Sequence, residues 1–117
     1  MNLDQLQGMS GMDKQFLSKT KAIIKAHLQQ ESLSVEMLGK ELGMSRVHLY
    51  RKMKHLTGMT VSEFIREMRL TKALELLREN NLSIAEVAYE TGFSNPSYFT
   101  KCFKERFKQP PSQFISA

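Results

Sequence analysis

Two stretches of the chain carry basic and hydrogen-bonding side chains at helical spacing. On a helix, each set falls on one side, opposite the apolar residues of the same stretch. Arginine and lysine can donate to guanine edges and to phosphates, and apolar groups can contact thymine methyl groups. The pattern therefore predicts two recognition helices in the major groove of double-stranded DNA. The two sets are Val47, Tyr50, Arg51 and Lys54 in the first stretch, and Ser97, Thr100, Lys101 and Lys104 in the second.

A simpler interpretation is that these basic residues only coat a solvated helix surface, as on most single basic helices. Two features weigh against it. No acidic residue occurs between Met44 and Gly58, and the same pattern recurs in the second stretch. DNA contact is therefore favoured.

The two stretches are the second helices of a repeated unit. Residues 34–65 align with residues 83–115, with one extra residue in the second copy, so that apolar, glycine and helix-capping positions coincide. Such self-similarity is typical of a duplicated structural unit. A short helix, a glycine turn and a second capped helix is the helix-turn-helix pattern. The aligned pairs include Leu38 with Val87, Gly43 with Gly92, Leu49 with Phe99, and Met53 with Phe103.

The ends of the first helix in each unit are marked by specific residue types. Ser34 and Ser83 are good N-caps, and Glu86 completes a capping box with Ser83. Gly43 and Gly92 stand where each first helix should stop, because glycine adopts the left-handed conformation without strain. The two units should therefore share their helix boundaries.

Two longer helices should support these units. One is expected from Asp13 to about Gln30, to cover the first unit. The other should run from Val61 to about Glu79 behind a capping box of Thr60 and Glu63. Its apolar residues change side halfway, which predicts a semi-rigid connector whose two halves pack on different units. A helix buried on all sides is the alternative.

Composition limits the classes of protein that fit. The chain has 117 residues, 41% hydrophobic content and a net charge of +5, which indicate one compact region and a polyanionic partner. No apolar run approaches the roughly 20 residues of a membrane span. Residues 1–12 lack the features of a signal peptide and are expected to be a mobile leader or part of a linker.

Cysteine and histidine usage argues against redox, metal or enzyme chemistry. The single cysteine, Cys102, excludes an internal disulfide, fits a reducing cytoplasm and should be a small buried side chain. No cluster of Cys, His or carboxylate residues has metal-ligand spacing, and no nucleophile–base pair or phosphate loop is evident. We therefore expect no cofactor and no enzymatic activity.

The second unit carries a resemblance to a known family. Residues 82–104 resemble the signature of AraC/XylS-type transcription regulators, residues 38–45 with 49–52 resemble the first unit of that family, and Arg69, Leu70, Ala73, Leu76 and Leu77 resemble its connector helix. The resemblance covers residues 13–115. It implies an all-α fold of about seven helices, with a first unit at 13–59, a connector at 61–79 and a second unit at 83–117. Both recognition helices would bind one face of the duplex.

The resemblance also assigns roles to individual positions. Arg46, Lys54, Asn95 and Lys104 are expected in the DNA interface, with Asn95 and Lys104 near phosphates. The sequence departs from the family at Lys108, where glycine is usual, and lysine in a left-handed position costs about 1 kcal/mol. An altered turn is therefore predicted there. The base-facing residues would be Val47, Tyr50 and Arg51, with Ser97, Thr100 and Lys101 as counterparts.

The predicted function is sequence-specific binding of double-stranded promoter DNA by the cytoplasmic output domain of a bacterial transcription regulator. The first unit resembles, in particular, output domains of hybrid two-component regulators. RNA polymerase is expected as a further partner, and the isolated domain should be monomeric, with a dimeric parent protein left open. The competing prediction is a helical protein-interaction domain that docks on the transcription machinery through Val47 and Tyr50.

Overall fold

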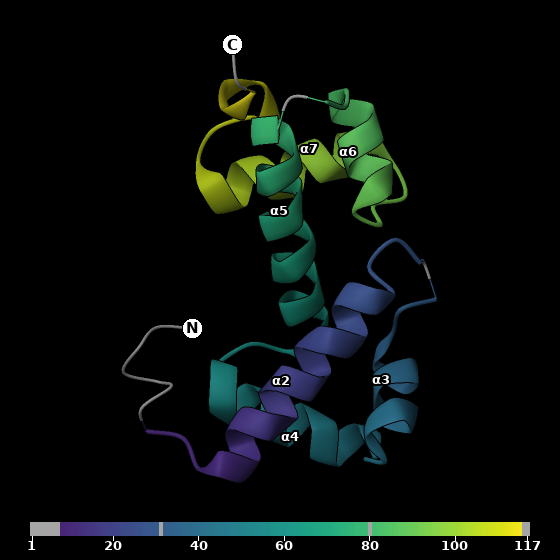
Figure 1. The fold of residues 1–117 in the computed structure, drawn as a ribbon, viewed down its shortest axis with the longest axis vertical. Coiled ribbons are helices and arrows are strands. Elements are labelled where there is room, and N and C mark those ends of the chain that lie inside the picture. Colours follow the sequence, from purple (N-terminus) through teal and green to yellow (C-terminus); the bar gives the residue numbers. More distant parts are fainter. Residues whose placement is uncertain (1–7, 31, 80, 116–117) are drawn as a thin grey trace. The chain divides into compact units, whose positions relative to one another are not determined.

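The computed structural model describes residues 8–30, 32–79 and 81–115. Within these ranges the chain is all-helical, with six α-helices, one 3-10 turn and no strand, which confirms the expected fold class. No described helix is long and apolar enough to cross a membrane. The elements, shown in Figure 1, are α2 (Gly11–Ala26), α3 (Val35–Leu42), α4 (Arg46–Thr57), α5 (Val61–Glu79), α6 (Ile84–Glu90), α7 (Pro96–Phe107) and η1 (Pro111–Phe114).

The chain forms two compact units, and the second is discontinuous in sequence. Of the described residues, the first unit has 8–27 and 32–65, and the second has 28–30, 66–79 and 81–115. The boundary lies within α5. Val61, Phe64 and Ile65 are buried in the first unit, whereas Ala73 and Leu77 are buried in the second. This confirms that the two halves of α5 pack on different units.

Helix α2 is displaced from its predicted position. It begins at Gly11, because the Ser10 hydroxyl accepts a hydrogen bond from the Asp13 amide at 3.1 Å, and it ends at Ala26 rather than near Gln30. The predicted range of the leader therefore overlaps the first helical turn, and residues 1–7 lie outside the described part. Beyond the helix, backbone carbonyls of residues 28 and 30 accept hydrogen bonds from a side chain of α5.

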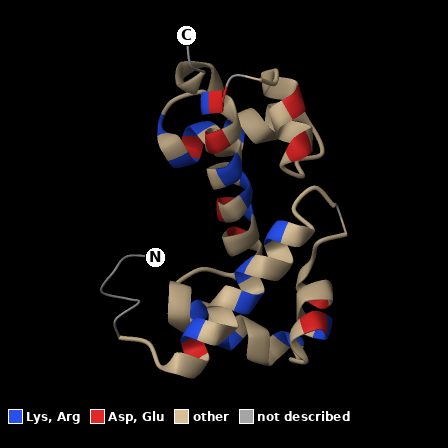
Figure 2. Cartoon of the chain, in the orientation of Figure 1, with Lys and Arg blue, Asp and Glu red and all other residues tan. Residues whose placement is uncertain are grey.

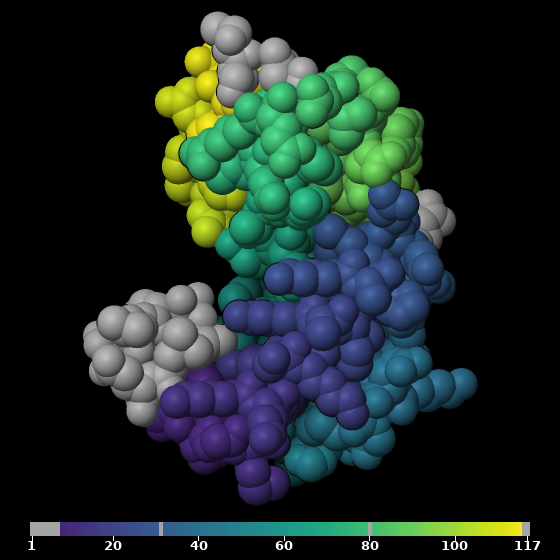
Figure 3. All heavy atoms as spheres, viewed as in Figure 1, coloured from purple at the N-terminus to yellow at the C-terminus, as the bar shows by residue number. Residues whose placement is uncertain are grey.

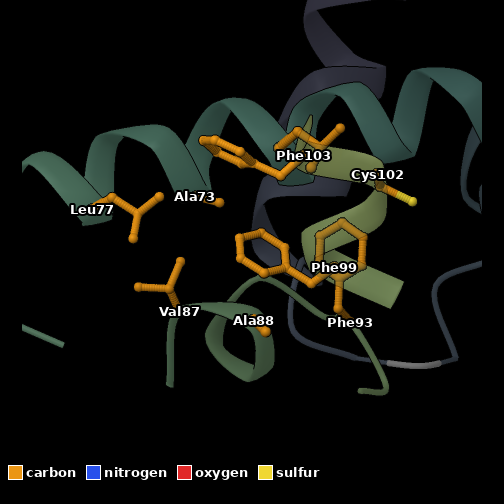
Figure 4. Close-up of a cluster of buried hydrophobic side chains, with 9 residues drawn as sticks. Ala73, Leu77, Val87, Ala88, Phe93, Phe99, Cys102 and Phe103 are labelled. Atoms are coloured by element: carbon orange, nitrogen blue, oxygen red, sulfur yellow. The ribbon is translucent and has the colours of Figure 1, made fainter. Parts of the chain in front are cut away.

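An aromatic cluster fills the core of the second unit (Figure 4). The Phe99 ring lies 5.1 Å from Phe93 and 5.6 Å from Phe103, between ring centroids. Cys102 is buried in the same cluster, as predicted. Aromatic pairs at these distances contribute about 0.5–1.5 kcal/mol beyond the area they bury.

The turn after α7 has the usual left-handed conformation, although lysine in place of glycine at residue 108 predicted a different turn. Lys108 has φ +67°, and its amide donates to the Lys104 carbonyl at 2.8 Å. The 3-10 turn η1 follows, and Phe114 packs its ring 5.4 Å from that of Phe103. The predicted altered turn is therefore wrong. The packing of Phe114 offsets a left-handed lysine, which costs about 1 kcal/mol.

Candidate nucleic-acid interface

In the first unit, caps and a glycine turn fix the start of α4. Ser34 caps α3 by accepting from the Met37 amide at 3.2 Å, and Gly43 ends α3 with φ +65°. Ser45 then caps α4 by accepting from the His48 amide at 3.1 Å. These local hydrogen bonds set the direction in which α4 leaves the turn.

Helix α4 separates its buried and exposed sides as its sequence predicts. Leu49 and Met53 are fully buried, whereas Val47 and Tyr50 are 58% and 49% exposed. Val47 and Tyr50 are three positions apart on the helix, and Arg51 and Lys54 are each four positions beyond one of them, so the four side chains lie on the same side. The structure therefore places Val47, Tyr50, Arg51 and Lys54 together on the exposed side of α4.

The basic residues of α4 differ in their electrostatic partners. Arg46 makes an exposed ion pair with Glu36 of α3 at 3.0 Å. Lys52 lies 3.8 Å from Asp13 and 4.9 Å from the centroid of the Phe16 ring, on the side packed against α2. Arg51 and Lys54 form no ion pair with any described residue. Their charges are therefore available to a polyanion.

The second unit starts α7 with a different cap. Asn95 Oδ1 accepts from the Tyr98 amide at 2.7 Å, and Pro96 occupies the first helical position. Helix α6 begins with the predicted capping box of Ser83 and Glu86, and the hydrogen bonds from Ser83 hold the pKa of the Glu86 carboxyl below its usual value. The side-chain oxygen Oδ1 of Asn95 is thus engaged in the cap. The expected place of Asn95 near a phosphate stays a prediction.

The remaining predicted residues of α7 share its outer side. Ser97, Lys101 and Lys104 are exposed and Thr100 is half-buried, while Phe99 and Phe103 are fully buried. Lys101 and Lys104 form no ion pair with any residue that the structure describes. Each unit therefore presents two unpaired basic residues from equivalent positions.

Arg106 belongs to a different part of the second unit. Its Nε donates to Glu67 at 2.7 Å, its Nη2 lies 2.7 Å from the same carboxylate, and these hydrogen bonds raise the pKa of the Arg106 guanidinium. The Arg106 guanidinium is therefore occupied by the Glu67 carboxylate of α5 and was not assigned to the DNA interface.

Charge is distributed unequally within each helix-turn-helix. The first helices each carry two acidic residues, Glu36 and Glu41 on α3 and Glu86 and Glu90 on α6, whereas α4 has none and α7 has one, Glu105 in its last turn (Figure 2). A polyanion is consequently attracted to the second helix of each unit and repelled by the first. No three described His, Cys, Asp or Glu residues form a group that could hold a metal ion.

Sequence reasoning missed the partners that lie across a turn or far along the chain. Nothing in the local pattern pairs Arg46 with Glu36, Lys52 with Asp13 or Arg106 with Glu67. Opposite charges on neighbouring helices were the available signal, but the helix packing was needed to choose among them.

In each unit a left-handed glycine precedes a capped second helix. This helix exposes lysine or arginine residues that form no ion pair with any described residue. These features define a DNA-binding protein of the helix-turn-helix class. A family model described as a helix-turn-helix domain matches residues 38–117. The chain belongs to this family, in its AraC type.

A known protein is similar to most of the chain. The chain is 40% identical over 106 residues to Histidine kinase P4 of Formosa agariphila, and the match covers 91% of this chain and 8% of that protein. The chain thus spans a small fraction of this relative.

Solved structures extend the similarity. An AraC-type transcriptional regulator from Chromobacterium violaceum is 25% identical with a TM-score of 0.82, over 90% of this chain and 93% of that chain. The DNA-binding domain of the global transcriptional factor AdpA, solved in complex with a target DNA, is 28% identical with a TM-score of 0.76, over 84% of this chain and 87% of that chain.

Proposed function

We propose that this chain is the output domain of a bacterial transcription regulator, which binds specific double-stranded DNA with α4 and α7 in adjacent major-groove segments. The observation that carries the proposal is a pair of capped helices whose basic residues at equivalent positions form no ion pair with a described residue. These are Arg51 and Lys54 on α4 and Lys101 and Lys104 on α7. Membership of the AraC type supports it, as does the similarity to a domain solved with its target DNA.

Residue roles follow from position along each helix. Arg51 and Lys101 would reach base edges, with Val47 and Tyr50 against thymine methyl groups and Ser97 and Thr100 as their counterparts. Lys54 and Lys104 lie about one turn further along and would hold phosphates. Arg46 and Asn95 would contribute at the helix starts, Arg46 by exchanging Glu36 for a phosphate.

The parent protein is proposed to be a hybrid two-component regulator. The support is the similarity to part of a histidine kinase. In such a protein this chain would act in the cytoplasm, receive the signal from other domains and contact RNA polymerase once on DNA. As an isolated domain it would be a monomer.

Selection of bound duplexes from a random pool, followed by titration in increasing salt, tests the DNA-binding proposal. If about five to eight basic residues neutralise phosphates, log K should fall with log salt at a slope of about −4 to −7. A slope near zero would contradict DNA binding. It would favour the alternative of a protein-docking helix pair, which the exposure of Val47 and Tyr50 also fits.

The spacing of the two boxes tests whether one chain uses both helices. Two recognition helices on one face of B-DNA bind about 10–10.5 base pairs apart. Inserting about five base pairs between the selected boxes should therefore remove the contribution of one unit. Affinity that ignores the insertion would show that the connector is flexible.

A further inference from the structure

A charged side chain of α5 is partly buried against the backbone of a short segment. Arg69 Nε donates to the Leu28 carbonyl at 3.2 Å, and its Nη2 donates to the Gln30 carbonyl at 3.1 Å. Burial lowers the pKa of the Arg69 guanidinium. All three residues belong to the second unit. Two hydrogen bonds from one planar guanidinium fix the position of the segment as well as its contact.

Gly92 provides the space for this contact. It has φ +89°, and a Cβ atom placed on it would collide with the Leu28 carbonyl oxygen and lie 2.6 Å from Arg69 Nε. Gly43, its counterpart in the first unit, has φ +65° and nothing within 4 Å of such an atom. Gly43 is therefore needed only for its backbone conformation, whereas Gly92 is also needed for close packing.

A second contact holds the same segment. Gln29 donates from its side-chain amide to the carboxylate of Glu90, the last residue of α6. The space-filling view shows the blue segment that follows α2 against green atoms of the α6 region (Figure 3). Segment 28–30 is thus held at the end of α6 and at the glycine that follows.

The turn held in this way leads directly into α7. The Gly92 amide donates to the Tyr89 carbonyl at 3.1 Å, and the Phe93 amide donates to the Ala88 carbonyl at 3.0 Å. The Phe93 ring packs on Phe99 of α7. A displacement of the turn would consequently displace the buried side of the recognition helix.

We propose that Arg69 is a positioning residue for α7, which acts by holding segment 28–30 against the turn at Gly92. The second helix-turn-helix then has three parts, namely α6, α7 and a backbone segment from much earlier in the chain. The effect on DNA rests on the proposed function, whereas the effect on the turn does not. The first unit has no equivalent of this contact at Gly43.

Amide hydrogen exchange of the unbound chain tests the positioning directly. Loss of two hydrogen bonds from a charged group in Arg69→Gln should speed exchange at Gly92 and Phe93 by about 10- to 100-fold. Exchange at Gly43 and Met44, which form the equivalent turn in the first unit, should stay unchanged. Equal rates at Gly92 and Phe93 in the variant and the original chain would overturn the proposal, whether or not the chain binds DNA.

Two matched controls separate this effect from lost charge and from backbone strain. Arg66→Gln removes the same charge from an exposed position of α5 and should leave exchange at Gly92 unchanged. Gly92→Ala and Gly43→Ala both place alanine at positive φ, but only Gly92→Ala adds a collision. It should therefore speed exchange in its own turn more than Gly43→Ala does in its turn. Equal effects would count against the proposal.

Binding to duplexes with one scrambled box provides the functional readout. Arg69→Gln should lose about tenfold or more in affinity for a duplex with both boxes intact. It should match the original chain when the second-unit box is scrambled. Equal losses on every duplex would indicate a general structural role and overturn the positioning role. If the unsubstituted chain bound no duplex, only the proposed function would be contradicted. The positioning role would still be tested by hydrogen exchange, which needs no DNA.

Discussion

The two helix-turn-helix units share their helix order but differ in charge and in core. The first unit has nine Lys and Arg against five Asp and Glu, a net charge of +4, while the second has eight against seven, a net charge of +1. The buried side of α4 contributes Leu49 and Met53 to the core of the first unit. The equivalent buried residues of α7 in the second unit are Phe99 and Phe103. The two units thus keep equivalent caps and turns while their net charge and core packing differ.

The largest effect should come from the core of the second unit. Phe103→Ala should destabilise the chain by about 3–5 kcal/mol, because it removes a fully buried ring that packs on Phe99, Phe107 and Phe114. The equivalent change in the first unit, Met53→Ala, should cost about 2–5 kcal/mol and less than Phe103→Ala. Urea unfolding measures both. A larger cost for Met53→Ala would reverse the comparison of the two cores.

Base recognition should also be unequal. Arg51→Ala should lose about 1–3 kcal/mol of discrimination in one half of the site, since arginine can bond a guanine edge through two donors. Lys101→Ala should lose less in the other half, because lysine acts as a point charge. Affinities for preferred and scrambled duplexes measure the difference.

Matched changes further along the helices serve as controls for base recognition. Lys54→Ala and Lys104→Ala should weaken preferred and scrambled duplexes alike, because phosphate contacts carry no direct sequence information. If Arg51→Ala gave that same uniform loss, Arg51 would be a backbone contact.

The ends of the recognition helices differ by one residue type. Gly58 ends α4 with φ +74°, and Lys108 ends α7 with φ +67°. Lys108→Gly should therefore stabilise the chain by about 1 kcal/mol, and raise its Tm by about 4 °C, by relieving the left-handed lysine. Gly58→Lys should destabilise it by a similar amount. Thermal unfolding checks both, and a loss of stability in Lys108→Gly would show that the lysine side chain stabilises the turn.

The smallest effect concerns the exposed ion pair of the first unit. Glu36→Gln should strengthen DNA binding by about two- to fivefold, because Arg46 would no longer have to break its ion pair with Glu36 to contact a phosphate. The effect should be small, since exposed ion pairs contribute little free energy. Glu41→Gln is the matched control, with no ion pair to a described residue. A gain as large in the control would indicate a general charge effect.

The sequence predicted well whatever depends on neighbouring residues. The capping boxes, the left-handed glycines and the buried sides of α4 and α7 follow from spacing within one or two turns, and the structure has them. The end of α2 and the turn at Lys108 were predicted wrongly. In both places contacts distant in sequence decide, from Arg69 to Leu28 and from Phe114 to Phe103. The DNA contacts of individual residues remain predictions.

The discontinuous second unit also has a consequence for the order of folding during synthesis. Segment 28–30 leaves the ribosome before its partner Arg69, which lies 41 residues beyond Leu28. Most of the residues between them form the first unit. Closing a loop costs entropy that grows with the length of free chain, and a folded insert shortens that free length. The first unit should therefore fold early and lower the entropic barrier to completing the second, so that the chain assembles from its N-terminal end toward α7.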